Sequence, residues 1–390
     1  MAVNTLNFNQ LATILNAVNR QATGVDNITP TNVGEFVSVA QTTLLTGYDN
    51  VISAISQVLS RTIFSTRPYN RKFKGLDRDS QQWGNHVRKL SVIDDAAQDD
   101  QRFPLEDGVG VDQQKVRKPK VLQTNFYGAN VWQRSVTLFK DQLDVAFSGP
   151  DEFGAFIGMV MQNVSDLIEQ DRENTARGTV ANLIGGTIAA GGANVIHLVA
   201  EYNDATGLNL DSDTVKAPEN FTAFWRWAWA RIKTVSDLLT ERSVLYHQNI
   251  TGKPISRHTP KDRQMLYLYA ADVNNAEASV MSTTFHDQYL QGVDFERVNF
   301  WQSIQTPMGI QVKPTYMTAD GTLTTPEDAV TQSNILGVLF DEEAAGVTTV
   351  NEWSAPAPFN AAGGYTNTFW HYTHRFYNDF TENVVVFLMD

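Results

Sequence analysis

A helical stretch that begins near residue 150 constrains this chain more than any other part of the sequence. Gly149-Pro150-Asp151 opens it, because proline suits a first helical turn and an acid there favours the helix dipole. The apolar residues that follow match one helical face, and they are Phe153, Phe156, Ile157, Val160, Met161, Val164, Leu167 and Ile168. The pattern stops at Gly185-Gly186 and predicts a helix over 150–185, about 50 Å long. A helix this long with a single apolar stripe is a support on which other layers of a fold lie.

A long polar stretch without helical period occupies residues 61–126. Asp, Gln, Lys, Arg, Gly and Pro dominate it, so we expect a solvent-bathed loop or a long extended hairpin. About sixty residues without a core pattern are uncommon inside a compact domain and are usually functional or bound to a partner. From Val121 to Phe139 apolar and polar residues alternate again, which predicts a strand that returns to the body.

The remaining segments predict a mixed fold. Residues 1–60 form an amphipathic, partly irregular arm. Helices are predicted from Pro218, with an aromatic stripe that we interpret as core, and from Thr259-Pro260 through Tyr269. Later residues alternate like strands and finish in the buried-strand run 384–388. The predicted fold class is α+β.

The distribution of charge predicts a contact surface. Thirty basic and forty-three acidic residues give a net charge of −13, which argues against a DNA or RNA reader. Residues 61–120 carry thirteen basic and nine acidic residues, so they are net positive within an acidic chain. Such segregation predicts docking on an acidic surface, including that of another copy. The predicted contact residues are Arg71, Lys72, Lys74, Arg78, Trp83, Lys115, Arg117 and Lys118.

Searches for catalytic and metal-binding patterns give no candidate residue. The chain has no cysteine, which excludes disulfides, thiolate metal sites and a cysteine nucleophile. Thr251-Gly252-Lys253 lacks the upstream glycine of a phosphate loop, and His371 and His374 are expected on opposite sides of a strand. The sequence contains no secretion signal and no run of about 18 apolar residues. We therefore predict a protein without catalytic residues, cofactor, metal or membrane span.

The order of these parts resembles the major capsid protein of tailed bacteriophages, which has the Hong Kong 97-type fold. The resemblance rests on the arm, the polar excursion, the returning strand, the long one-striped helix, an α+β middle and the last apolar strand. It implies a division into an N-terminal arm (1–60), an E-loop (61–126), a P-domain with the spine helix (127–194), an A-domain (195–345) and closing P-domain strands (346–390). No cross-linking residues are carried over.

The resemblance also implies a function and partners. Copies of the chain would form hexamers and pentamers of an icosahedral or prolate shell that encloses double-stranded DNA without sequence-specific contacts. Scaffolding and portal proteins would assist assembly in the host cytoplasm, and the product would be the virion capsid. Two alternatives remain open at this point. One is an encapsulin-type nanocompartment shell, which neighbouring portal and terminase genes would argue against. The other is a hydrolase with an unrecognised site.

Overall fold

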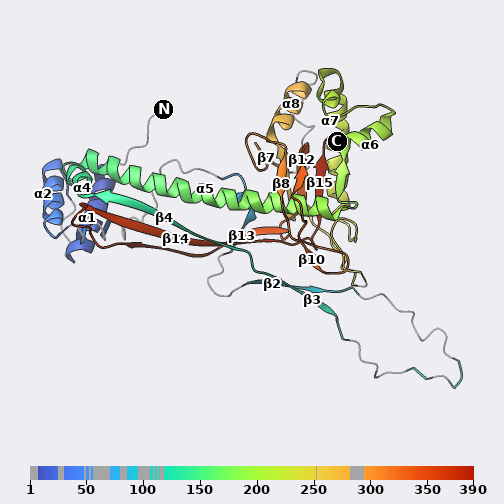
Figure 1. Ribbon diagram of the computed structural model, residues 1–390, viewed down its shortest axis with the longest axis horizontal. Coiled ribbons are helices and arrows are strands. Elements are labelled where there is room, and N and C mark those ends of the chain that lie inside the picture. The colour runs from blue at the N-terminus through green and yellow to red at the C-terminus, as the bar shows by residue number, and fades with distance from the viewer. Residues whose placement is uncertain are drawn as a thin grey trace.

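The computed structural model describes the chain in several stretches, and a long helix organises them. That helix, α5 (Pro150–Ala190), lies along a sheet of long strands, with small helices at one end and a second sheet at the other (Figure 1). The α+β prediction is confirmed. The described residues are 8–24, 30–47, 50–51, 54–55, 71–79, 86–94, 106–108, 110–111, 114, 118–251, 253–281 and 294–390.

Helix α5 begins where the sequence predicts and continues further. Pro150 occupies its first turn, and the helix ends at Gly191, whose φ of 64° suits glycine. The predicted end at Gly185-Gly186 is wrong, because both glycines lie inside the helix at close contacts. A Cβ on Gly186 would stand 2.3 Å from the Phe380 ring, and one on Gly185 would stand 2.4 Å from Val312. These glycines let the helix approach its neighbours.

The long strands form a four-stranded sheet in the order β1-β13-β14-β4. Their bounds are β1 (Asp77–Arg78), β4 (Ala129–Phe139), β13 (Ala345–Pro356) and β14 (Tyr365–Asn378). Strand β14 pairs antiparallel with both β13 and β4 over nearly its whole length. Tyr372 and His374 of β14 are buried, and the Tyr372 hydroxyl bonds Asp171 of α5. One face of this sheet is therefore packed on α5.

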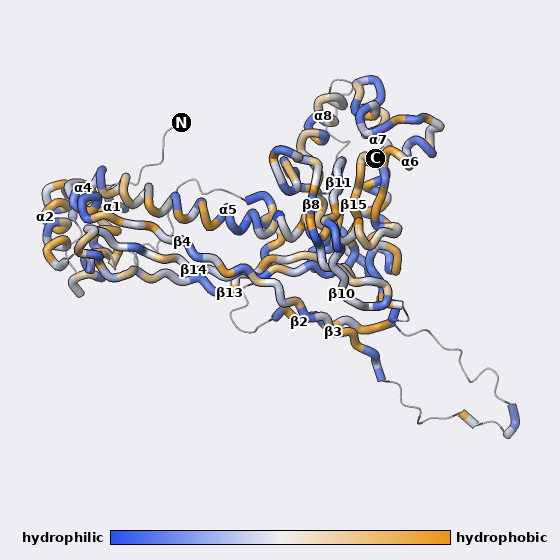
Figure 2. The backbone as a smooth tube through the Cα atoms, viewed as in Figure 1, coloured by the Kyte–Doolittle hydropathy of each residue, from blue (hydrophilic) through white to orange (hydrophobic). Residues whose placement is uncertain are grey.

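A five-stranded sheet in the order β5-β15-β12-β6-β7 forms the second body. Its strands are β5 (Val195–His197), β6 (Gln264–Tyr269), β7 (Glu296–Val298), β12 (Ile335–Asp341) and β15 (Val384–Leu388). Every residue of β12 and β15 is buried, as a central strand covered on both faces requires. Figure 2 shows long hydrophobic stretches in this region.

Three helices belong to this second body. They are α6 (Leu198–Thr206), α7 (Pro218–Leu238) and α8 (Ala270–Met281). The aromatic stripe of α7 lies in the core, where Phe221, Trp225 and Trp229 pack with Leu339 and Phe387 of the sheet. The interpretation of this stripe as core is confirmed.

The helix predicted from Thr259-Pro260 is wrong. Only Lys261–Arg263 forms a helical turn, the 3-10 segment η3, and β6 follows directly. Strand β6 lies between β12 and β7, so hydrogen bonds to two neighbouring strands outweigh the local start signal.

The N-terminal helices α1 (Phe8–Thr23) and α2 (Val33–Leu44) pack with α4 (Lys140–Ala146) and the start of α5. Two short pairs, β8 (Ile310–Val312) with β11 (Val330–Gln332) and β9 (Tyr316–Met317) with β10 (Leu323–Thr324), are the remaining strands of the described residues. A short 3-10 turn, η2 (Thr214–Lys216), precedes α7. In the described part of the chain, no helix combines the length and apolar character needed to cross a membrane.

The predicted excursion 61–126 is only in part an excursion. Strands β2 (Val87–Val92) and β3 (Val121–Phe126) form a hairpin that, among the described residues, joins neither large sheet (Figure 1). The segment before it differs from the expectation. Phe73 and Leu76, in and beside the 3-10 turn η1 (Lys74–Leu76), are fully buried against α5.

The predicted closing region 346–390 is divided between the two sheets. Strands β13 and β14 belong to the long sheet, whereas β15 lies between β5 and β12 in the other. The sequence pattern identified the strands, but it carries no information on which sheet each one joins.

Candidate functional site

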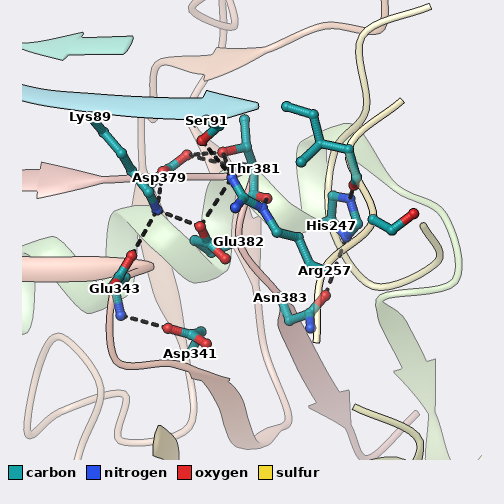
Figure 3. Close-up of polar contacts among 12 residues, drawn as sticks. Lys89, Ser91, His247, Arg257, Asp341, Glu343, Asp379, Thr381, Glu382 and Asn383 are labelled. Atoms are coloured by element: carbon teal, nitrogen blue, oxygen red, sulfur yellow. Dashed lines mark hydrogen bonds and ion pairs between the residues drawn. The ribbon is translucent and has the colours of Figure 1, made fainter. Parts of the chain in front are cut away.

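The root of the β2-β3 hairpin is held to the body by a cluster of charged side chains (Figure 3). Lys89 points from β2 toward the segment between β14 and β15. Its ammonium nitrogen lies 2.9 Å from Oδ2 of Asp379, and it donates a short hydrogen bond to Glu382. Glu343 stands 3.3 Å away on the exposed side. Asp379 and Glu382 are buried, so Lys89 neutralises carboxylates that water does not reach.

Arg257 forms the second half of this cluster. Its guanidinium donates to the hydroxyl of Ser91 on β2 at 2.9 Å and to the carbonyl of Thr381 at 3.0 Å, and it lies 3.1 Å from Glu382. Because Glu382 lies between Lys89 and Arg257, one buried carboxylate connects the hairpin to two segments of the second body.

The electrostatics of the cluster favour a charged lysine. Burial by itself would lower the pKa of Lys89, but the Asp379 and Glu382 carboxylates outweigh it and raise this pKa above its ordinary value. Burial raises the pKa of Glu382, although Lys89 and Arg257 oppose that shift. Lys89 therefore stays protonated throughout the physiological range and acts as a fixed positive charge.

A neutral histidine, His247, joins the segment before β15 to the loop that carries Arg257. The His247 ring lies 2.7 Å from the Ile255 carbonyl through Nε2 and 3.2 Å from the Asn383 side chain through Nδ1. Burial lowers the pKa of His247, so its neutral form fills this position. The loop that carries Arg257 is thereby fixed to the start of β15.

Asp94, two residues after the end of β2, also attaches the hairpin to the body. Its carboxylate accepts hydrogen bonds from the Ser256 backbone N–H and from Arg242, and its own N–H donates to the Pro254 carbonyl. The bonds from Ser256 hold the pKa of Asp94 below its usual range. The end of β2 is thus tied to residues 242–257 through Ser91 and Asp94.

The outer face of the hairpin carries an uncovered apolar patch beside polar residues. Leu90, Val92 and Val121 project from the face opposite Lys89 and Ser91, and their side chains are 58%, 63% and 54% exposed. A two-stranded hairpin has little stability of its own in water. Contacts with the body hold this hairpin in place, and its apolar patch remains exposed. An exposed apolar patch of this kind is typical of a surface that contacts a partner.

The structure engages two of the predicted contact residues within their own chain. Arg71 is largely buried and pairs with Asp77 and, at 3.5 Å, with Glu169 of α5. Arg78 donates to the carbonyls of Glu342 and Ala345. These two arginines attach the segment around β1 to the body.

The other predicted contact residues fall into two groups. Lys72, Lys74 and Lys118 have exposed side chains. Trp83, Lys115 and Arg117 lie outside the described residues. The structure therefore leaves three lysines of the predicted set as available surface cations.

The prediction missed the residues that hold the hairpin, because their partners are remote in sequence. Lys89 stood among thirteen basic residues of the excursion and nothing local distinguished it. The signal that could have found its partners is the acidic sequence Asp379-Phe380-Thr381-Glu382, placed directly before a wholly apolar strand.

Reactive side chains do not converge on a reaction centre in the part of the chain described here. Among the described residues no group of three or more His, Cys, Asp or Glu side chains could hold a metal ion. His374 is buried against Trp132 and Tyr372, whereas His371 stacks on Trp353 at 4.0 Å on the other face of β14. Asp211 accepts hydrogen bonds within its own turn.

Comparisons with known proteins agree with this geometry. A chain in the capsid structure of Staphylococcus phage Andhra is similar over 84% of this chain and 87% of that one, with a TM-score of 0.54 and 12% identity. A chain in the structure of the head fiber and inner core protein of native bacteriophage P68 gives the same coverage and TM-score, at 10% identity. No curated protein sequence matched. The family model of the Phi29-like phage major capsid protein matches residues 11–388, and the chain therefore belongs to this family of structural capsid proteins.

Proposed function

We propose that this major capsid protein builds the head of a tailed phage by assembling into hexamers and pentamers of a closed icosahedral or prolate shell. The observation that carries the proposal is the hairpin. Its root is fixed by Lys89, Arg257 and Asp94, while its outer face exposes Leu90, Val92 and Val121. An apolar surface held away from the chain's own core is covered when a neighbouring subunit packs on it.

We also propose that the parts of the subunit correspond to those of the Hong Kong 97-type fold. The hairpin β2-β3 serves as the E-loop, and α5 with the long sheet serves as the P-domain. The five-stranded sheet with α6, α7 and α8 serves as the A-domain, and β15 belongs to it. Helices α1 and α2 represent the N-terminal arm and pack on the start of α5.

The proposal includes the packaged DNA and the scaffolding and portal proteins that assist assembly. The net charge of −13 suits enclosure of double-stranded DNA without tight or sequence-specific contacts, because an acidic wall does not retain the packaged polyanion. Scaffolding and portal proteins would set the size and the unique vertex, and assembly would take place in the host cytoplasm. No observation on this chain favours an encapsulin-type compartment or a hydrolase.

The hairpin's outer face provides the test. Leu90→Asp with Val92→Asp places two charges on the exposed apolar surface, and we expect shells to be lost while the monomer keeps its circular dichroism spectrum. The matched control is Gln123→Asp with Asn125→Asp, which adds the same two negative charges at polar positions of the same face. Sedimentation and negative-stain microscopy measure the shells, with and without a co-expressed scaffold. A wild-type protein that remains monomeric under all these conditions would overturn the proposal.

A further inference from the structure

A cavity lies between α4 and the first turns of α5, at the end of the subunit remote from the five-stranded sheet (Figure 1). It has a volume of about 410 Å³, and its floor is apolar. Val145 is 59% exposed there, beside Ala146, Ala155 and the largely buried Phe156. The apolar lining of this cavity is therefore open to solvent, and a partner that packed on it would bury Val145.

The rim of this cavity is acidic. Asp141 of α4 and Glu152 of α5 line it with exposed side chains, and Gln142 is also part of the lining. Asp144 of α4 and Asp151 of α5 lie on the same two helices, and Lys140 is the first residue of α4. Acids in a first helical turn complement the helix dipole. The dipole gives no reason for an uncovered apolar floor between them, so the combination calls for a partner that is both cationic and apolar.

A segment of the chain itself has this chemistry. Lys118-Pro119-Lys120 precedes β3, and all three residues are exposed. Among the described residues neither ammonium group makes an ion pair. Proline presents an apolar ring and has no backbone N–H to satisfy, and the residue before it favours an extended backbone. Two cations that flank an apolar ring match two carboxylates that flank an apolar floor.

The two surfaces cannot meet within one subunit. Helix α4 lies at one end of the long molecule, and the segment before β3 lies beyond the middle of it, on the hairpin that points toward the other end (Figure 1). We infer that the cavity between α4 and α5 receives Lys118-Pro119-Lys120 of a second copy. This inference rests on the proposed self-assembly and names the contact. Such a head-to-tail contact joins different surfaces of identical subunits, and it closes into rings when the rotation between copies allows.

Charge reversal on the two sides provides the experiment. The hairpin variant carries Lys118→Glu with Lys120→Glu, and the cavity variant carries Asp141→Lys with Glu152→Lys. Each variant alone sets like charges against each other at every contact, so we expect shell yield at low salt to fall about tenfold. The quadruple variant restores opposite charges and should recover most of the yield.

A mixture of the two assembly-deficient variants gives the sharper readout. When the two alternate around a ring, every acidic hairpin meets a basic cavity, and every wild-type hairpin meets a wild-type cavity. An equal mixture should therefore form six-membered rings that neither variant forms alone. A contact made within one subunit would not produce this complementation.

The control carries the same change in net charge elsewhere. Lys233→Glu with Lys313→Glu alters two surface lysines, on α7 and after β8, that lie outside both the cavity and residues 242–257, and should assemble like the wild type. Normal shells from both charge-reversed variants would overturn the inference and leave the proposed function intact, as would a quadruple variant or mixture that fails to recover. A wild type that forms no shells would instead refute the proposed function.

Discussion

The ammonium group of Lys89 lies 2.9 Å from the buried carboxylate of Asp379 and ties β2 to the segment that leads into β15. Removing this cation would leave Asp379 and Glu382 facing each other with only Arg257 to balance them. We expect Lys89→Met to destabilise the monomer by about 3 kcal/mol, because an uncompensated buried carboxylate remains. Urea unfolding measures the loss. Arg88→Met, on the exposed face of the same strand, should stay within about 0.5 kcal/mol of the wild type. Equal effects from the two changes would refute the anchoring role of Lys89.

Arg71 and Lys72 are adjacent in sequence and should respond differently to the same substitution. Arg71→Met removes the paired cation of Asp77, whereas Glu169 keeps its pair with Arg172, so we expect a loss of about 1–2 kcal/mol. Lys72→Met removes an exposed ammonium and should change stability by less than about 0.5 kcal/mol. Thermal and urea unfolding of the two variants measure the change in the free energy of unfolding. A neutral Arg71→Met variant would show that the arginine is free to serve a neighbour instead.

The exposed lysines of the segment before β1 test the role of charge between subunits. Lys72→Glu with Lys74→Glu keeps Arg71 and therefore the fold. We expect lower shell yield at low salt and partial recovery at high salt, where repulsion from an acidic neighbour is screened. Sedimentation at two ionic strengths measures both. If the yield were normal at low salt, these lysines would be merely solvated, and the charge argument for this segment would fail.

Two glycines of α5 predict opposite outcomes for one substitution. A Cβ on Gly178 would have no atom within 4 Å, so Gly178→Ala should stabilise the helix by up to about 1 kcal/mol. At Gly186 the Cβ would stand 2.3 Å from the Phe380 ring, and Gly186→Ala should cost about 1–3 kcal/mol. Thermal unfolding compares them. A stabilising Gly186→Ala would mean that α5 does not pack this closely on Phe380.

Glu352 predicts a pH dependence between the long sheet and α5. The contacts with His374 and Arg172 lower the pKa of Glu352 from its ordinary value of 4.5 to about 2, despite burial. A carboxyl with a lowered folded pKa contributes stability above about pH 4.5 that is lost as the pH falls toward 2. Glu352→Gln should therefore flatten the loss of stability in this window. Urea unfolding at several pH values measures it, with the exposed Glu327→Gln as control. Parallel curves for Glu352→Gln and the wild type would contradict the assignment.

Local periodicity predicted the secondary structure of those elements whose own apolar pattern is enough to specify it. The apolar stripe from Phe153 to Ile168 identified α5, and the aromatic stripe of α7 identified core. Prediction failed where a remote partner decides. Gly185-Gly186 has the sequence of a helix end, and only Phe380 and Val312 explain why the helix continues. Thr259-Pro260 has the sequence of a helix start, yet strands on both sides of Met265–Tyr269 draw it into a sheet.

The candidate site was predicted as a region and missed as a set of residues. The surplus of positive charge pointed to the excursion and its neighbours, but charge counting treats Arg71 and Lys74 alike. One is paired within its own chain, and the other is exposed. Lys89 was indistinguishable because Asp379 and Glu382 reach it only after the whole chain has folded.

The central place of β15 has a consequence for synthesis of the subunit. Residues 384–388 separate β5 from β12, and the segment just before them holds the hairpin root. Translation proceeds at about 5–20 residues per second, so tens of seconds pass between the emergence of β5 and that of β15 from the ribosome. During that interval the second sheet lacks the strand between β5 and β12, and Lys89 lacks its two buried carboxylates. We therefore expect a chain truncated before residue 379 to present its hairpin to a neighbouring subunit less firmly than the full chain does.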